Sequence, residues 1–141
     1  MSNQVVGNVG LYYVCYRLSC LGWNVMPTAR NARGIDVVIY NQNATKTLTI
    51  QVKSLSKCPP VPLGHHLENL FGDFFIICRN LAGQAPECFI LEPKEVKRLA
   101  YKGRTTMQSR RNFWLQPKAY AVSDFKEKWD RIGKGAEDLV V

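Results

Sequence analysis

Apolar positions at the start of the chain repeat with the period of an α-helix. Over residues 3–21 this repeat predicts a helix with one continuous inner face, formed by Gln4, Gly7, Leu11, Val14, Cys15 and Leu18. Tyr12, Tyr13 and Tyr16 lie on the opposite side. A helix that is apolar nearly all round is expected to be buried or to face a partner subunit. Gly22 is expected to end it.

Shorter apolar runs in the middle of the chain have the length and composition of strands. Residues 35–40 and 47–54 flank the turn-rich stretch "NQNAT", which predicts an antiparallel hairpin. Trp23 and Val25 begin another strand-like stretch. Further strands are expected over residues 74–79, 88–91 and 113–115. These strands, together with the first helix, indicate an α/β fold.

The remaining segments predict loops and short helices. Residues 55–73 are rich in proline and glycine, which is typical of a loop that is either functional or poorly ordered, with one helical turn in "ENLFGD". A short helix is expected over residues 95–101, and a loose tail from Gly133. Ser123 can cap a final helix with an inner stripe of Phe125, Trp129 and Ile132.

No repeat and no linker divides the sequence, so we expect one domain over residues 1–141. Apolar residues make up 46% of the chain and charged residues 21%, which is an ordinary globular balance. No apolar run approaches the length of roughly 18 residues that a membrane span needs. We see no secretory signal, and the five cysteines form no CxxC pair, so we expect a reducing, cytoplasmic location.

The charge balance points to an anionic partner. Lys and Arg number 19 against 11 Asp and Glu, which gives a formal net charge of +8. Nucleic acid is the first candidate and a membrane surface the second, while a purely solubilising charge is the plain alternative. Candidate contacts to DNA are Arg30, Arg33, Lys46, Lys102, Arg104, Arg110 and Arg111. For Arg110 and Arg111 a solvated loop is an equally good explanation.

Three polar residues interrupt the predicted hairpin. Gln51 and Lys53 share one face of the second strand, and Asp36 lies at the start of the first, where pairing can bring it beside Gln51. A carboxylate oxygen, an amide oxygen and an ammonium group around one point suit metal-assisted phosphodiester hydrolysis. Taken singly, Asp36 can be a turn cap and Lys53 a solvated strand residue.

"GID" with Asp36, followed by "QVK" with Gln51 and Lys53, resembles the motif of the PD-(D/E)xK restriction-like nuclease superfamily. Gln51 stands where a glutamate is usual. The resemblance implies a restriction-endonuclease-like core, with a mixed central sheet flanked by helices. It also implies Asp36 and Gln51 as ligands of Mg²⁺ or Mn²⁺, and Lys53 as the catalytic lysine.

Many members of this superfamily carry a further metal-binding glutamate on the first helix. Leu11 occupies that position here, either as a natural change, as an engineered one, or as an ordinary core residue. With Asp36 as the remaining carboxylate, we expect weak metal binding and little cleavage.

The small size, the basic charge and the QxK motif are also similar to bacterial intron-encoded homing endonucleases. That likeness implies cleavage of a specific double-stranded DNA site by a homodimer or homotetramer. A non-catalytic DNA-binding or assembly subunit with the same fold is the alternative, and a plain structural protein is a third.

Overall fold

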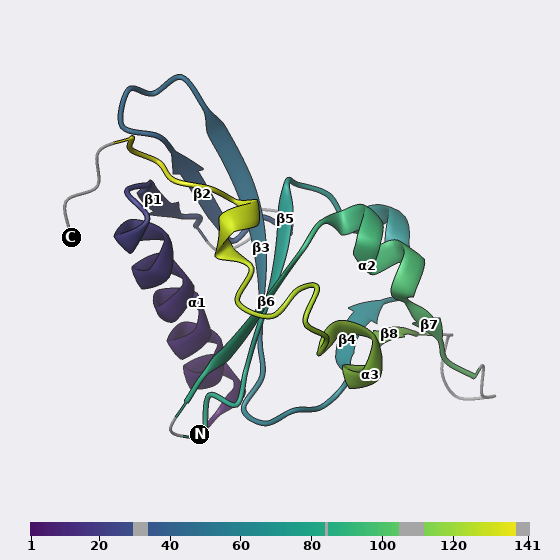
Figure 1. Ribbon diagram of the computed structural model, residues 1–141. Helices are drawn as coiled ribbons and strands as arrows, with labels where there is room; N and C mark the ends of the chain where they lie inside the picture. The colour runs from purple at the N-terminus through teal and green to yellow at the C-terminus, as the bar shows by residue number, and fades with distance from the viewer. Residues whose placement is uncertain (30–33, 84, 105–111, 138–141) are drawn as a thin grey trace.

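A computed structural model describes residues 1–29, 34–83, 85–104 and 112–137. Within these residues a long helix and a five-stranded sheet form one half of the molecule, and a three-stranded sheet with short helices forms the other (Figure 1). The helices are α1 (Asn3–Cys20), α2 (Pro93–Leu99) and α3 (Pro117–Tyr120), with short 3-10 turns at Leu67–Asn69 and Trp129–Arg131. The predicted first helix and its end near Gly22 are therefore confirmed.

The larger sheet has the strand order β1-β2-β3-β5-β6. These strands are β1 (Asn24–Pro27), β2 (Val37–Tyr40), β3 (Thr47–Ser54), β5 (Phe74–Arg79) and β6 (Glu87–Leu91). Its β3 and β5 are parallel, whereas the other neighbours are antiparallel, so the sheet is mixed. The predicted hairpin is confirmed as β2 and β3, in which Val37 pairs with Ile50. The prediction of an α/β fold with a mixed central sheet is also confirmed.

The two faces of this sheet bury two separate apolar clusters. Ile50, Ile76 and Cys78 pack towards α1, while Phe75 and Ile77 on the same β5 pack towards the half that contains α2 and the smaller sheet. A strand covered on both faces needs apolar residues at every position, which explains the continuous run "FFIIC". The sheet therefore separates α1 from α2, α3 and the smaller sheet.

The inner face of α1 differs from the predicted stripe. Val6, Gly10, Val14 and Leu18 are the buried residues, while Gln4 is exposed and Leu11 is half-buried. Gly10 explains the change, because a Cβ there would lie 2.6 Å from Ser54 Cβ on β3. Where α1 comes closest to the sheet, the helix residue that faces β3 is therefore Gly10 and not Leu11.

A strand was not predicted inside the proline-rich segment. Residues Val61–Gly64 form β4, which pairs with β8 (Phe113–Leu115) in a three-stranded sheet ordered β4-β8-β7, where β7 is Tyr101–Lys102. Because β4 is an edge strand, Pro62 can lack its N–H without leaving a neighbour unpaired. The short helix predicted over residues 95–101 instead spans Pro93–Leu99, since Glu92 caps it and Pro93 suits its first position.

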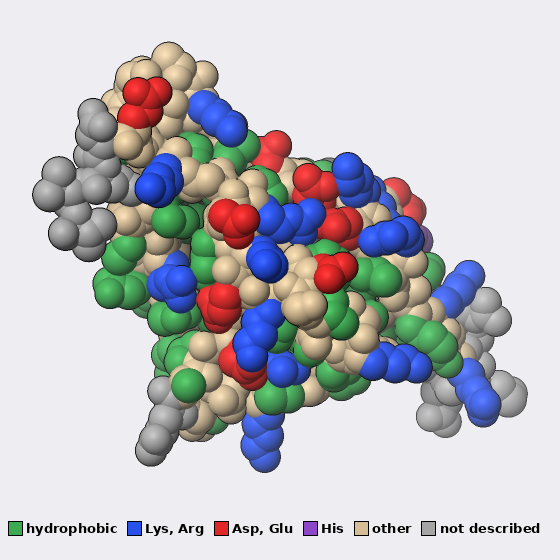
Figure 2. Space-filling view, in the orientation of Figure 1, with side chains coloured by type: hydrophobic (Ala, Val, Ile, Leu, Met, Phe, Trp, Pro, Cys, Tyr) green, Lys and Arg blue, Asp and Glu red, His purple; other side chains and the backbone are tan. Residues whose placement is uncertain are grey.

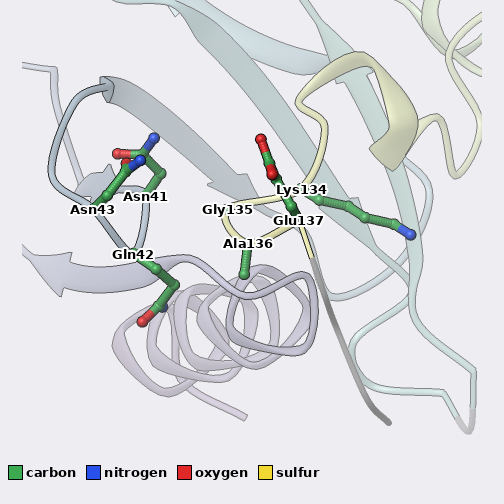
Figure 3. A pocket seen from close by; sticks show the side chains of 7 residues that line it. All are labelled: Asn41, Gln42, Asn43, Lys134, Gly135, Ala136 and Glu137. Atoms are coloured by element: carbon green, nitrogen blue, oxygen red, sulfur yellow. The ribbon is translucent and has the colours of Figure 1, made fainter.

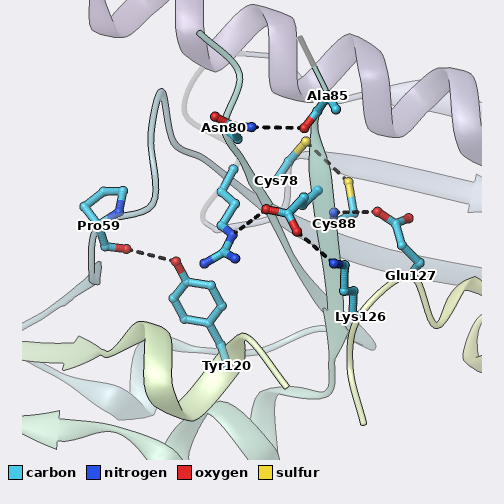
Figure 4. A network of polar contacts seen from close by, with 10 residues as sticks. Pro59, Cys78, Asn80, Ala85, Cys88, Tyr120, Lys126 and Glu127 are labelled. Carbon is cyan, nitrogen blue, oxygen red and sulfur yellow. Dashed lines mark hydrogen bonds and ion pairs between the residues drawn. The ribbon is translucent and has the colours of Figure 1, made fainter. Parts of the chain in front are cut away.

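The predicted final helix after Ser123 is wrong. This segment instead follows the outer edge of β6, where the Phe125 carbonyl accepts the Ile90 N–H at 2.9 Å. The Glu127 side chain accepts the Cys88 N–H at 2.9 Å, next to the buried Cys78 and Cys88 thiols (Figure 4). Glu127 has a φ of +52°, which a helix cannot contain. Covering the polar groups of an open sheet edge takes precedence over helical periodicity.

Residues 134–137 are held in place, contrary to the loose tail expected from Gly133, and residues 138–141 lie outside the described residues. Gly135 is buried, donates to the Leu21 carbonyl at 2.9 Å and accepts from the Gln42 N–H at 2.9 Å. These bonds join the C-terminal segment to the end of α1 and to the hairpin turn. Among the described residues, no helix combines the length and the apolar character that crossing a bilayer requires.

Candidate active site

Asp36 lies at the end of the β2–β3 ladder. Its backbone N–H donates to the Ile50 carbonyl at 2.9 Å, which continues the pairing of the two strands. Its carboxylate Oδ2 accepts the Val52 N–H at 2.7 Å. The carboxylate is thus fixed to the backbone of β3 through one oxygen, at the point where the two strands separate.

The environment of Asp36 favours its protonated form. Burial raises the pKa of this carboxyl above its ordinary value, while the Val52 N–H and the nearby charge of Lys53 act in the opposite direction. A raised pKa in a cavity is a feature of functional carboxyl groups. A cation bound beside Asp36 would compete with the proton for the same oxygens.

A cavity of about 290 Å³ surrounds the Asp36 carboxylate, between α1 and the end of β3. Its lining consists of Gly7, Asn8, Leu11, Asp36, Val52, Lys53 and Ser54. Leu11 therefore lines the same cavity as Asp36 and Lys53, while it also packs against the core on the α1 side of the sheet. A side chain at position 11 can reach the space in front of Asp36.

Gln51 precedes Lys53 by two positions on β3. It lines a second cavity of about 670 Å³, which is bounded by the segment before β5. Its lining consists of Gly34, Gln51, Lys53, Leu63, Glu68, Asn69, Leu70 and Phe71. Lys53 lines both cavities, whereas Asp36 and Gln51 each line one. Of the three predicted residues, Lys53 is thus the one shared by both parts of the candidate site.

Several residues that line these cavities were not predicted as site residues, and four of them matter most for the chemistry. Asn8 faces the Asp36 cavity from α1, and Glu68, Asn69 and Phe71 face the Gln51 cavity from the turn before β5. Asn8 lies three positions before Leu11, so helical spacing could have indicated it. The other three could not be placed, because their position depends on the pairing of β4 with a strand some 50 residues later in the chain.

The donor set fits a hard divalent cation only when DNA completes it. The described residues contain no group of three His, Cys, Asp or Glu side chains that could hold a metal. Asp36 supplies one carboxylate, Gln51 an amide oxygen, and Leu11 nothing. Magnesium is commonly bound by one or two carboxylates together with water and substrate phosphates. The residues present thus suit a cation that binds together with a phosphate group.

The predicted DNA-contact residues that the structure describes do not form one cluster. Lys46 is exposed in the turn between β2 and β3, while Lys102 and Arg104 are exposed at β7, on the opposite side of the molecule in Figure 1. Figure 2 shows Lys and Arg side chains spread across much of the visible face. Arg30, Arg33, Arg110 and Arg111 lie outside the described residues.

Another cavity, of about 420 Å³, lies away from these residues. It is formed by Asn41–Asn43 in the hairpin turn and by residues 134–137 (Figure 3). The labelled side chains of Gln42 and Lys134 point away from each other in this view. The side-chain amide of Gln42 already has a structural partner, since it donates to the Gly22 carbonyl at 2.6 Å. This cavity is best explained by the anchoring of the C-terminal segment.

Comparison with known proteins identifies solved structures with a similar fold. No family model and no curated protein matches the chain. The solved structure of the bacterial homing endonuclease I-Ssp6803I is similar over 94% of this chain and 93% of that chain, with a TM-score of 0.61 and 14% identity. Archaeoglobus fulgidus Hjc, a Holliday junction resolvase, aligns with 78% of this chain and 90% of its own, with a TM-score of 0.49 and 19% identity. The chain therefore shares the fold of the I-Ssp6803I structure, in agreement with the predicted mixed central sheet flanked by helices.

Proposed function

We propose that the chain is a DNA endonuclease that hydrolyses phosphodiester bonds of a specific double-stranded site with a divalent cation. The observation that carries the proposal is the cavity shared by Asp36 and Lys53, at the end of the hairpin of a nuclease fold. A fixed carboxylate beside a lysine and an open space is the arrangement that metal-assisted hydrolysis requires.

Each polar residue has a role in this proposal. Asp36 and Gln51 would hold Mg²⁺ or Mn²⁺ beside Lys53. The cation, when bound, supplies positive charge next to the phosphate and acidifies a water molecule. Lys53 lies at the boundary of the two cavities, where its ammonium group can orient the attacking water and stabilise the charge on the phosphate.

DNA binding is supported by the net charge of +8. Lys46, Lys102 and Arg104 are the exposed candidate contacts, and their wide separation suits a long duplex that crosses the whole molecule. Further candidate contacts are Arg30, Arg33, Arg110 and Arg111. Contacts to phosphates position a duplex, so the residues that read its sequence are a separate set.

Oligomerisation is supported by the outer face of α1. Val5, Val9, Tyr12 and Tyr16 follow one another at helical spacing with exposed fractions of 44%, 37%, 63% and 63%. Arg17 is the one charged residue of this helix, and it already pairs with Glu127 at 3.4 Å. In Figure 2 hydrophobic side chains gather along the α1 edge at the left. An uncharged stripe of this kind suits contact with a second copy in a homodimer or homotetramer.

A second candidate function is a non-catalytic DNA-binding or assembly subunit. Leu11 favours it, because an apolar side chain occupies the helix position that faces Asp36. The two candidates share DNA binding and differ in cleavage. If the chain is an endonuclease, we expect the wild-type protein with Leu11 to hydrolyse DNA slowly.

Binding and cleavage assays on duplex DNA test the proposal. Affinity should fall steeply between about 50 and 200 mM salt, because phosphate contacts release counterions. Slow cleavage should appear with Mg²⁺ or Mn²⁺, and should disappear with chelator and in Lys53→Ala. Lys57→Ala is the matched control, since Lys57 is an exposed lysine nearby in the chain that lines neither cavity. Absence of binding at low salt would reject both candidate functions.

A further inference from the structure

The cavity that contains Gln51 has a wall that the proposed hydrolysis does not use. Leu63, Leu70 and Phe71 form an apolar side, and Glu68 and Asn69 add polar groups. Its volume of about 670 Å³ lies within the range of roughly 300–1,000 Å³ that is usual for ligand sites. A mixed lining of this kind suits a flat ligand with polar edges better than it suits a phosphate.

Phe71 is the exposed aromatic residue of this wall. Its side chain is 46% exposed, although Leu70 beside it is 5% exposed. The ring lies next to Gly34, where a Cβ would stand 3.6 Å from the ring atom Cε1. Gly34 has a φ of +65°, a conformation that disfavours a larger residue. The ring is thus supported by backbone on one side and is open for stacking towards the cavity.

The polar groups of the cavity match the edge of a nucleobase. The side-chain amide of Asn69 has no hydrogen-bond partner in the part of the chain that the structure describes, and it offers a donor and an acceptor. Glu68 adds a carboxylate that faces His66 Nδ1 at 3.3 Å. A carboxylate repels phosphate, whereas Lys53 at the boundary attracts it. The charges therefore favour a base inside the cavity and its phosphate at Lys53.

We propose that this cavity receives a nucleobase that has left the DNA stack, with Phe71 stacked on its face. The proposal rests on the proposed DNA endonuclease function and specifies its substrate. The DNA is bound with one nucleotide unpaired or turned out of the helix, next to the phosphate at Lys53. Such extrusion costs least where the base is already unpaired.

Measurements of equilibrium DNA binding in the presence of chelator test the base-binding cavity, because no cleavage occurs without a divalent cation. Two duplexes of the same sequence are compared by fluorescence anisotropy, one fully paired and one with a single extra unpaired nucleotide. The wild-type chain should bind the second about tenfold more tightly, the effect expected of one aromatic–base stack. Phe71→Leu keeps the apolar volume and removes the ring, so it should abolish this preference and leave binding of the paired duplex unchanged. Phe71→Trp should retain the preference.

Tyr101→Leu is the matched control, because Tyr101 is a 51% exposed aromatic residue on β7 that does not line the cavity. It should keep the wild-type preference. Equal affinity of the wild type for both duplexes, or an unchanged preference in Phe71→Leu, would overturn the base-binding cavity while the endonuclease proposal stands. Absence of binding to either duplex at low salt would overturn both.

Discussion

The Asp36 carboxylate accepts a 2.7 Å hydrogen bond from the Val52 N–H. The side chain of Asp36, just before β2, thus pairs with a backbone N–H of β3. This bond holds the carboxylate in a partly buried position, where burial raises its pKa. One oxygen is used by the backbone, and the other remains available to the cavity. The ionised carboxylate of Asp36 therefore lowers the stability of the folded protein. Such a cost is common for residues that are kept for function.

The pH dependence of stability should reveal that cost. A carboxyl with a raised folded-state pKa binds its proton more tightly when folded, so its stabilising contribution is present below the unfolded pKa and is lost as pH rises through the folded value. Asp36→Asn can keep the Val52 bond through its amide oxygen and carries no charge. Its free energy of unfolding should exceed that of the wild type at about pH 8, and this advantage should shrink towards about pH 4. Urea unfolding in chelator at both pH values measures it. An Asn variant that is less stable at the higher pH would show that Asp36 is a structural residue.

The close contact of α1 with β3 gives a second prediction. A Cβ at Gly10 would lie 2.6 Å from Ser54 Cβ, so Gly10→Ala should lower the free energy of unfolding by about 1–3 kcal/mol despite the better helix propensity of alanine. The variant with both Gly10→Ala and Ser54→Gly should regain part of that loss, because the colliding atoms are gone. Gly7→Ala is the matched control, since a Cβ there meets nothing within 4 Å, and it should be neutral or stabilising. Equal effects at the two glycines would contradict the close packing.

The parts of the fold that depend on local pattern were predictable from the sequence. The helical period of residues 3–20, the alternation in Thr47–Ser54 and the turn between the two hairpin strands each reflect neighbouring residues. The final helix failed because Phe125 and Glu127 serve the distant edge of β6, which no local window contains. Likewise β4 depends on pairing with β8 some 50 residues away.

The candidate site divides in the same way. Asp36, Gln51 and Lys53 could be named as candidates because the hairpin that carries them is local, and because their residue types resemble a known motif. Phe71 and Glu68 were not found, since the long connection before β5 has no periodic pattern and its path is set by tertiary contacts. The resemblance also named Leu11, and the packing of α1 on β3 places it in the same cavity as Asp36.

The exposed stripe on α1 predicts an oligomer without DNA. Tyr12→Lys combined with Tyr16→Lys should shift the chain towards monomer in sedimentation velocity, because two charges in an apolar contact between copies would lose their hydration. The melting temperature of the monomer should change little, since both side chains are 63% exposed. Met26→Lys on β1 is the control, as it is 48% exposed and lies outside the helix. A wild-type chain that is monomeric at tens of micromolar would contradict the prediction.

The helix position facing Asp36 provides the most direct test of catalysis. Leu11→Glu would place a second carboxylate in the cavity of Asp36 and Lys53. Because Leu11 is half-buried, the substitution should cost about 1–2 kcal/mol of stability without metal, which a bound cation should restore. The melting temperature should therefore rise more with Mn²⁺ or Mg²⁺ in this variant than in the wild type. Cleavage of DNA should increase together with metal binding.

Two further variants separate the carboxylate from its surroundings. Leu11→Gln has nearly the same shape without the charge, so it should show neither the metal-dependent stabilisation nor the full gain in cleavage. Leu11→Glu combined with Lys53→Ala should bind the cation but lose cleavage, because the ammonium group that acts on the phosphate is absent. A folded Leu11→Glu chain that binds cation and DNA tightly and never cuts, at any magnesium or manganese concentration, would favour the non-catalytic DNA-binding subunit. Cation-dependent cutting that disappears in the double variant would instead assign Lys53 to the reaction and position 11 to the metal.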